Sequence, residues 1–579
     1  MADLLYFDRQ DRELLKMINE IIDYGPSSDL EHKIFNTKLH AHGVLNLTTT
    51  HEYRMAQAVI NLLGSLNKTG SAEDRLAALR TLHDEVLHSA QTTFRYNTGR
   101  VLIQIMKAII RSRHDEATQL KLIHDFRKAA SGNPRIVREF LTRHHLMEMP
   151  EEWNQLTMDH HVHDANTKGR KSATHLIMDA WVKGIRHLTV VYYNYVELAA
   201  ARELLYAADI MGLTVRIGFE LRATFRGRYV DFIWTPRGFS DTEDFLGFLA
   251  KPTVASFLGE TRKASLWVQQ HVMKTLDVWN STHAPALASE LGITVPRIEA
   301  DAFLAFVGKG QPSLLHLAEI IHKTLLPLMQ ERVLLLLENG ASETLSEEQR
   351  QLIARMDTLT PTVIHDTWLR PDRNPDLPSP DVPYLDGDSD DRPEILCLSV
   401  HQLLERLHSI RSGYRITLQL AGLSVEDVLE ILWDGQGIVT HLELFNVKEW
   451  HDGNLTQLKQ INEIQNAINH GDVMQLKQML RAMMAGFDDS PEGEERRAKF
   501  KHILLHIPEL QAMYRYVPLH SHFGTDSTSH LGNRYGMGLA VPETLPRNAR
   551  KRLTGNKFIS PVTLPIRVGV GYRENYREQ

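Results

Sequence analysis

The chain has 579 residues, of which 42% are hydrophobic and 24% charged, and its formal net charge is -7. A length of this kind is enough for about two to four globular domains. The negative net charge excludes a global basic footprint, so nucleic acid is not favoured as a partner. The single cysteine, Cys397, excludes an internal disulfide and any zinc site built on several cysteines.

The sequence also argues against a membrane protein. The first residues, Met1 to Asp8, lack the basic region and apolar core of a signal peptide. No apolar run approaches the roughly 18 residues that a membrane helix needs. We therefore expect a cytoplasmic protein without a membrane partner, and the single cysteine fits that reducing compartment.

Residues 1–150 carry apolar side chains at helical spacing throughout. Leu15, Ile18 and Ile22 share one face of a helix, and the same spacing recurs between Val101 and Ile110. The pattern predicts a helical N-terminal domain that packs on the rest of the protein or mediates assembly, so a homo-oligomer is one expectation.

From residue 157 onward, predicted strands alternate with predicted helices. A helix from Ala173 to Lys183 is closed by Gly184, and a second helix ends before Gly212. Runs of β-branched and aromatic residues at 188–193 and 213–220 predict the intervening strands. Alternation with helices of about 10–15 residues predicts a parallel sheet or a barrel, whose active groups lie at the carboxyl ends of the strands.

The motif that carries chemistry is Asp159-His160-His161-Val162-His163. Residues two apart on a strand point to the same side, so His161 and His163 can aim at one point, as two ligands of one metal ion must. Glu220 ends a later strand of the same predicted sheet and can converge with them. Imidazole suits Zn, Mn, Fe or Ni, and added carboxylates favour Mn or Fe.

Residues 156–222 resemble the polymerase-and-histidinol-phosphatase (PHP) domain. The resemblance rests on Asp159-x-His161-x-His163, on the pair Ala180 and Gly184, and on the segment from Gly212 to a final Gly-φ-Glu at Glu220. It implies an α/β fold, a distorted TIM-like (β/α) barrel that binds up to three metal ions. The Thr-Asp-His motif of that family is absent, and Val191-Tyr192-Tyr193-Asn194 stands in its place.

Two later segments resemble other parts of the same family. Residues 436–446 are similar to its Ile-Glu-φ-φ-Asn strand, and Gly524-Thr525-Asp526-Ser527 is similar to its terminal Gly-Ser-Asp-Ala-His and to the Gly-Thr-Asp of amidohydrolase barrels. The resemblance implies that Asp526 holds a metal or acts as general base. Further ligands are expected among His441, His520, His522 and His530, with His365 as one candidate in the middle of the chain.

These observations predict three regions. A helical domain covers 1–150, and a metal-dependent hydrolase-like α/β barrel covers 151–540, with an acidic, proline-rich linker or loop at 370–393. A basic, proline-containing tail at 541–579 is expected to be extended, either wrapping a neighbouring subunit or presenting guanidinium groups to phosphates.

The leading interpretation is a metal-dependent hydrolase, a phosphoesterase that uses a metal-activated water on a small-molecule or phosphorylated substrate. It would hold one to three Mn, Fe or Zn ions. The expected metal ligands are His161, His163, Glu220, His441, His520, His522 and Asp526, with Asp526 and Glu220 as the catalytic carboxylates. The alternatives are an amidohydrolase or deaminase acting on a C–N bond, and a degenerate barrel that serves as a binding or scaffold subunit.

Overall fold

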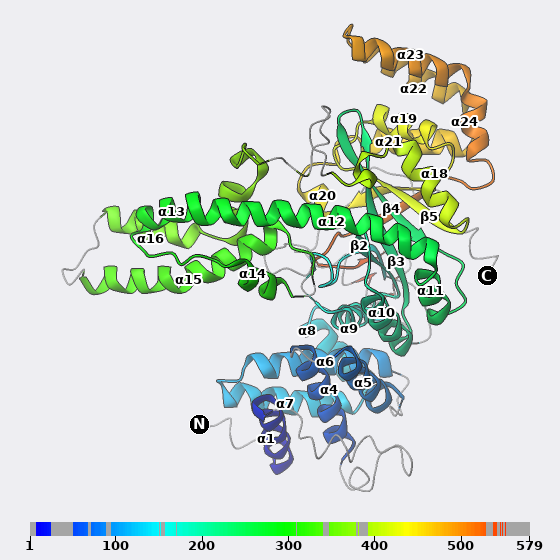
Figure 1. The fold of residues 1–579 in the computed structure, drawn as a ribbon. Helices are drawn as coiled ribbons and strands as arrows, with labels where there is room; N and C mark the ends of the chain where they lie inside the picture. Colours follow the sequence, from blue (N-terminus) through cyan, green and yellow to red (C-terminus); the bar gives the residue numbers. More distant parts are fainter. Residues whose placement is uncertain are drawn as a thin grey trace.

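The computed structural model describes residues 7–24, 50–67, 71–88, 94–149, 151, 157–169, 171–308, 310–339, 347–377, 380, 392–528, 536–540, 545, 547 and 550–551. The candidate ligand His530, most of the proline-rich segment at 370–393 and most of the basic tail lie outside these residues. The described chain forms a helical bundle, a barrel of strands and helices, and a helical arm (Figure 1).

The helical bundle contains α1 (Arg9–Tyr24), α4 (His51–Asn67), α5 (Ala72–Leu82), α6 (Arg95–Arg111), α7 (Glu116–Ala130) and α8 (Pro134–Arg143). Short polar side chains fix several of its helix starts. Ser71 forms a capping box with Asp74 at the start of α5. Asp115 caps α7, and Asn133 caps α8, whose first residue is Pro134. The apolar faces predicted from spacing are buried, including Ile18 and Ile105.

The barrel is built from β1 (Thr157–Val162), β2 (His187–Tyr193), β3 (Thr214–Phe225), β4 (Arg228–Pro236), β5 (Tyr414–Gln419), β6 (His441–Asn446) and β7 (His520–Gly524). Its neighbours are β7-β6-β5-β4-β3-β2-β1, and a short β8 (Leu539–Ala540) adds antiparallel to β1. A parallel bridge between Val162 and Ser527 brings β1 beside the end of β7 and nearly closes the ring. The fold is therefore the expected α/β, distorted TIM-like barrel.

The strand β4 accounts for the distortion, because it runs antiparallel to both of its neighbours. The chain turns directly from β3 into β4 at Arg226 and Gly227, both with positive φ, as a two-residue hairpin requires. The other pairs among β1 to β7 are parallel: β1 with β2, β2 with β3, β5 with β6, and β6 with β7.

The helices around the barrel include α9 (Ala173–Lys183), α10 (Leu198–Met211), α18 (Val400–Ile410), α19 (Val425–Asp434), α20 (Val447–His451), α21 (Leu458–Asn469), α22 (Val473–Gly486), α23 (Pro491–Leu505) and α24 (Ile507–Met513). Helix α9 has the predicted bounds, with Ser172 as N-cap and Gly184 in the left-handed conformation at its end. Helix α10 ends in the same way at Gly212. These glycines stop the helices so that the chain can turn back into the next strand.

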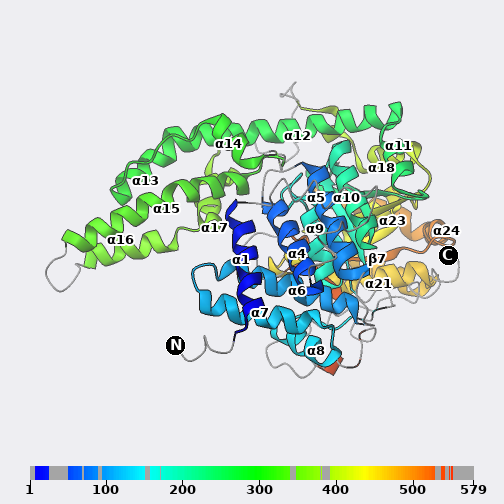
Figure 2. The same ribbon diagram turned by 90° about the horizontal axis from the view of Figure 1, so that it is seen from below.

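The helical bundle lies against α9 and α10 of the barrel (Figure 2). The two parts share one continuous apolar core, which includes Leu79 of the bundle and Trp181 and Leu204 of the barrel. A buried ion pair crosses the junction, where Arg75 donates to both carboxylate oxygens of Glu203 at 2.8 and 2.7 Å. The junction therefore combines apolar packing with one directional, buried charge pair.

A helical arm is inserted between β4 and β5, where sequence patterns aligned with no family motif. Helix α11 (Thr242–Leu249), which follows β4, still packs on the barrel core. The arm contains α12 (Pro252–Val278), α13 (Ala284–Leu291), α14 (Ala300–Val307), α15 (Leu314–Asn339), α16 (Glu347–Thr358) and α17 (Pro361–Ile364). Figure 1 shows α13, α15 and α16 extending sideways from the barrel. The arm has its own apolar core around Trp279, Phe303 and Ile321.

Helix α12 belongs to both cores. Its first half packs on the barrel through Val254 and Phe257, and its second half packs in the arm through Val272 and Leu276.

Among the described residues, no helix combines the length and the apolar composition that crossing a bilayer requires.

Candidate metal centre

The predicted histidine pair lies at the carboxyl end of β1, inside the barrel. His161 is 1% exposed and His163 is fully buried, and their ring centroids are 5.1 Å apart. The pairing of β1 with β2 is irregular between Asp159 and Val162, where three steps on β1 match two on β2. This bulge turns the strand, so that His160 also faces inward and stacks on His522 of β7.

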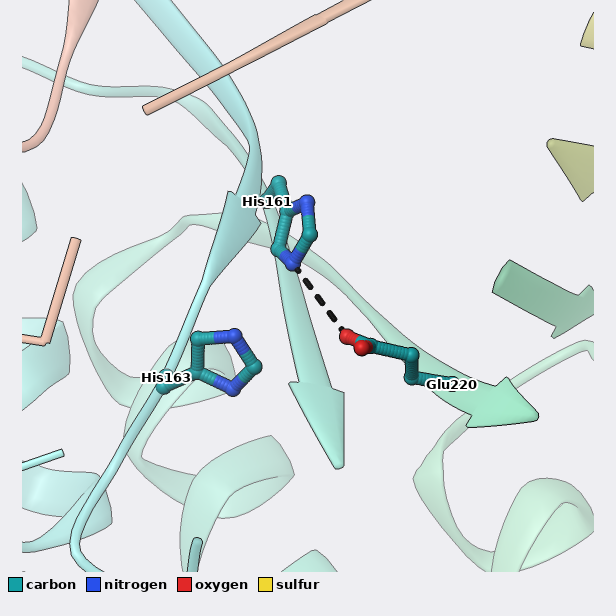
Figure 3. Close-up of side chains that lie close together, drawn as sticks. All are labelled: His161, His163 and Glu220. Atoms are coloured by element: carbon teal, nitrogen blue, oxygen red, sulfur yellow. Dashed lines mark ion pairs between the residues drawn. The ribbon is translucent and has the colours of Figure 1, made fainter. Parts of the chain in front are cut away.

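Two carboxylates from other strands join the pair. Glu220 of β3 points toward the two rings, with its Oε2 3.6 Å from Nε2 of His161 (Figure 3). Asp526 follows β7, and its Oδ1 lies 3.0 Å from Nε2 of His163 and 3.8 Å from Nε2 of His161. The structure thus brings together four of the predicted site residues, His161, His163, Glu220 and Asp526.

The donor set fits a divalent cation. One ligand atom each from His161, His163 and Glu220 lie within 4.8 Å of one another. Three buried atoms that face this point have no hydrogen bond of acceptable geometry within the described chain: Nε2 of His161, Nε2 of His163 and Oδ1 of Asp526. Buried polar atoms are rarely left unpaired, and two imidazoles with two carboxylates are ordinary ligands of Mn, Fe or Zn.

The electrostatics also favour a cation at this point. Burial would raise the pKa of Glu220, but contact with His161 and the charge of Lys168 lower it to about 2. Burial and Lys168 lower the pKa of His163 to about 4, so this imidazole is neutral and its nitrogen can donate to a metal. Burial would lower the pKa of His161, but Glu443 and Asp526 raise it well above its usual value. With this raised pKa the imidazole of His161 holds a second proton, and a bound metal ion would replace that proton.

Glu443 of β6 orients His161 and was not among the predicted ligands. Its Oε1 accepts a hydrogen bond from Nδ1 of His161 at 2.8 Å, and its other oxygen accepts from Nδ2 of Asn446 at 3.2 Å. A carboxylate on Nδ1 fixes the ring and directs Nε2 at the metal position, a common support of metal-binding histidines. The available signal was the resemblance of residues 436–446 to an Ile-Glu-φ-φ-Asn strand, whose glutamate falls at Glu443.

Asp159 fixes the segment that carries Asp526. Its Oδ1 accepts from the backbone N–H of Thr525 at 3.0 Å, and its Oδ2 accepts from the hydroxyl of Thr525 at 2.6 Å and from the N–H of Gly538 at 2.9 Å. Asp526 itself has a φ of +49°, a sparsely populated conformation that this network maintains. The first residue of the Asp-x-His-x-His motif therefore positions a ligand from the other end of the barrel.

Two lysines approach the same carboxylate. Nζ of Lys168 lies 3.0 Å from Oδ1 of Asp526, and Nζ of Lys448 lies 2.9 Å from Oδ2. Burial would raise the pKa of Asp526, but Lys168, Lys448 and His161 together hold it well below its usual value. Lys448 is 37% exposed at its side chain, so it connects the buried Asp526 carboxylate with the protein surface.

Aromatic packing occupies the place of the absent Thr-Asp-His motif. The ring of Tyr193 lies 5.1 Å from that of His163, and the ammonium group of Lys168 lies 5.0 Å from the same tyrosine ring. The arm reaches this edge as well, because Gln311, in the loop between α14 and α15, donates through Nε2 to the carbonyl of Tyr193 at 2.9 Å. The base of the arm therefore borders the centre.

The remaining predicted ligands lie elsewhere. His441 and His520 begin β6 and β7, at the amino ends of strands whose carboxyl ends border the centre, and their ring centroids are 5.0 Å apart. His522 packs between His160 and His441. His365 lies in the arm, with Nδ1 2.8 Å from the carboxylate of Asp366. None of these four belongs to the ligand group found among the described residues.

A substitution that touches no ligand tests this geometry. A Cβ added at Gly524 would overlap the Cβ of His161 and lie 3.0 Å from its backbone nitrogen. We expect Gly524→Ala to displace His161 and weaken metal binding about 10- to 100-fold, the range typical for lost ligand support. Metal titration of the purified variant measures this. Gly259→Ala in α12, where an added Cβ meets nothing within 4 Å, is the matched control. Equal metal affinity in all three proteins would contradict the described packing.

Comparison with known proteins adds no assignment. No protein-family model matches the sequence, and no curated protein matches it. A candidate metal-dependent phosphoesterase from Bifidobacterium adolescentis aligns at 15% identity and a TM-score of 0.32, over 68% of this chain and 94% of that one. An amidohydrolase from Chromobacterium violaceum, solved with sulfate and no metal, aligns at 12% identity and a TM-score of 0.33, over 66% and 92%. At such TM-scores neither likeness assigns an activity here.

Proposed function

We propose that this protein is a metal-dependent hydrolase that cleaves phosphoester bonds. The observation that carries the proposal is the convergence of His161, His163 and Glu220 on one buried point, with Asp526 Oδ1 3.0 Å from Nε2 of His163. Nε2 of each histidine has no hydrogen bond within the described chain. A divalent ion held there would lower the pKa of its water to about 7 and polarise a phosphoryl oxygen. The described residues supply one ligand group of this kind, and we propose Mn, Fe or Zn as its metal.

The chain's own residues have separable roles in this proposal. His161 and His163 would bind the metal ion, and Glu443 holds the ring of His161 in place. Asp526 lies against both imidazoles and both lysines, so it is placed to accept a proton from the attacking water. Its low pKa keeps it in the carboxylate form that a general base requires.

The two lysines favour a phosphoester over an amide. Lys168 and Lys448 place two ammonium groups beside Asp526, where an anionic substrate would receive charge-assisted hydrogen bonds. An amidohydrolase with a carboxylated lysine would need a neutral amine. Burial would lower the pKa of Lys168, but Asp526 and Glu220 raise it above its usual value, so this amine stays protonated.

The test combines metal analysis with a substrate screen. Elemental analysis of the purified chain is expected to give about one equivalent or more of Mn, Fe or Zn. The loaded protein is then assayed on phosphomonoesters, phosphodiesters and amides, beside Asp526→Ala. We expect phosphoester hydrolysis that falls about 10²- to 10⁴-fold in the variant, the usual contribution of a positioned general base.

Asp489→Ala is the matched control, because this carboxylate is 95% exposed and lies in the loop before α23. Its activity should equal that of the unmodified chain. Amide or deaminase turnover without phosphoester turnover would contradict the proposed bond type. A chain that takes up no metal after reconstitution would contradict the hydrolase proposal and favour a binding or scaffold role.

A further inference from the structure

The loop that follows β1 is held in one conformation by its own hydrogen bonds. It comprises residues 164–169, between β1 and α9, and we call it the β1 loop. The backbone N–H groups of Thr167 and Gly169 donate to the carbonyl of Asp164 at 3.1 and 2.8 Å. The carboxylate of Asp164 accepts from the hydroxyl of Tyr192, on β2, at 2.7 Å. These bonds fix the loop against the next strand of the barrel.

Thr167 is the residue of the β1 loop that contacts a proposed metal ligand. It is fully buried, and its Oγ1 lies 3.3 Å from Nδ1 of His163. The same hydroxyl donates to the carbonyl of Asp164 at 3.1 Å. A hydroxyl has one proton, so while it donates to Asp164 it can only accept from His163. Nδ1 of His163 then carries the proton of the imidazole.

The position of that proton decides whether His163 can bind a metal ion. A neutral imidazole has one N–H, and a metal ion takes the other nitrogen. With the proton on Nδ1, Nε2 keeps a free lone pair, and Nε2 is the atom that lies 3.0 Å from Oδ1 of Asp526 in the metal centre. Glu443 holds the Nδ1 proton of His161 in the same way. Thr167 and Glu443 therefore support one imidazole each.

The helical arm contacts the backbone of the β1 loop. The N–H of Gln311, between α14 and α15, donates to the carbonyl of Thr167 at 3.2 Å. Gly310 lies so close that a Cβ added there would be 2.8 Å from the carbonyl oxygen of Ala165 and 3.0 Å from that of Thr167. A side chain at this position would force the two backbones apart. The base of the arm therefore holds Thr167 by direct contact.

The arm also holds the segment that follows β2. Besides the bond from Gln311 to the carbonyl of Tyr193, Ser265 of α12 accepts through Oγ from Nδ2 of Asn194 at 2.9 Å. Asn194 has a φ of +63°, and its N–H donates to the carbonyl of Glu220 at 3.0 Å. The arm thus contacts chain segments beside two of the proposed ligands.

We propose that Thr167 is a positioning residue of the metal centre, and that the base of the arm sets the metal affinity by holding Thr167 in place. This inference rests on the proposed function and adds the regulation of the same site. A displacement of the arm would reach the metal ligand through two hydrogen bonds, from Gln311 to Thr167 and from His163 to Thr167.

Titration of the metal-free, full-length chain with Zn²⁺, against a chromophoric chelator, tests the role of Thr167. Thr167→Val keeps the shape of the side chain but removes the acceptor of the Nδ1 proton, so we expect Zn²⁺ affinity to fall about 10- to 100-fold. Thr167→Ser keeps the hydroxyl and should bind Zn²⁺ nearly as wild type does. Equal affinity in Thr167→Val and wild type, or a loss that serine does not rescue, would overturn this role and leave the hydrolase proposal standing.

Gly310→Ala tests the arm without altering the β1 loop, and it decides the proposal even if Thr167→Val does not fold. We expect faster amide hydrogen exchange in residues 164–169 of the metal-free chain and Zn²⁺ affinity lowered about tenfold. Gly247→Ala in α11, where an added Cβ meets nothing within 4 Å, is the matched control and should equal wild type in both measurements.

Unchanged exchange or unchanged affinity in Gly310→Ala would overturn the role of the arm. A wild-type chain that takes up no Zn²⁺ would overturn both this inference and the proposed function, which separates the two failures.

Discussion

A chain carrying His161→Ala together with His163→Ala is expected to lose its divalent metal while keeping its fold. Both imidazoles direct Nε2 at the same point, and no other histidine belongs to the described ligand group. Removing them leaves Glu220 and Asp526, which are too few ligands for a Mn, Fe or Zn site. We expect metal affinity to fall by more than about 100-fold, beyond the loss typical of a lost supporting residue.

Elemental analysis after desalting measures the metal, and circular dichroism with a thermal melt checks the fold. The chain offers a matched control in His502 and His506, two imidazoles 4.2 Å apart near the end of α23. Replacing both by alanine should leave the metal content unchanged. The assignment of the centre would be wrong if the His161/His163 variant folded and retained the wild-type metal content.

Glu203→Gln is expected to lower the free energy of unfolding by about 3 kcal/mol or more. Glu203 and Arg75 are each only 8% exposed at their side chains, and they join the helical bundle to the barrel. Breaking a buried pair leaves the other charge uncompensated, which costs about 3–5 kcal/mol. The amide keeps the shape of the side chain, so the loss reports charge rather than volume. Chemical unfolding followed by circular dichroism measures it.

The same pair gives a pH dependence with a definite sign. Burial would raise the pKa of Glu203, but its hydrogen bonds from Arg75 and Thr174 lower it below the usual value. A carboxyl group with a lowered folded-state pKa contributes its full stability above its unfolded pKa of about 4.3 and loses it as the pH falls through the folded value. The stability difference between wild type and Glu203→Gln should therefore shrink below about pH 4.

Glu197→Gln is the control, because Glu197 pairs with Arg262 at 2.9 Å but is 57% exposed. Exposed pairs contribute little, so this variant should unfold nearly as wild type does at every pH. If the free energy of unfolding of Glu203→Gln were no lower than that of this control, the buried pair would not stabilise the junction between the bundle and the barrel.

Local patterns in the sequence predicted the parts of the fold that local interactions determine. Helix α9 begins at Ala173 and ends before Gly184 as expected, because a serine cap and a left-handed glycine set its limits. The apolar runs that became β2 and β3 were also recognisable, and the barrel they predicted is confirmed. The histidine pair was visible because residues two apart on a strand share a side.

The features that the sequence did not predict depend on contacts between distant segments. Helix α12 gave no signal of its dual packing, since a helical pattern does not reveal which core each half contacts. Glu443 supports His161 from 282 residues away, and although a motif marks the strand that carries Glu443, local sequence does not show which histidine it pairs with. The inward position of His160 depends on an irregular step in β1, which strict alternation of sides would not allow.

The span of the centre along the chain also determines when it can form during folding. Asp159 contacts Thr525 across 366 residues and Gly538 across 379 residues, so the first and last strands must meet before Asp526 is in place. Contacts of such sequence separation form late and slowly, after the local helices. A nascent or truncated chain lacking the last strand would therefore carry both histidines without a complete site. Metal that binds only the closed barrel would stabilise the product of the final folding step.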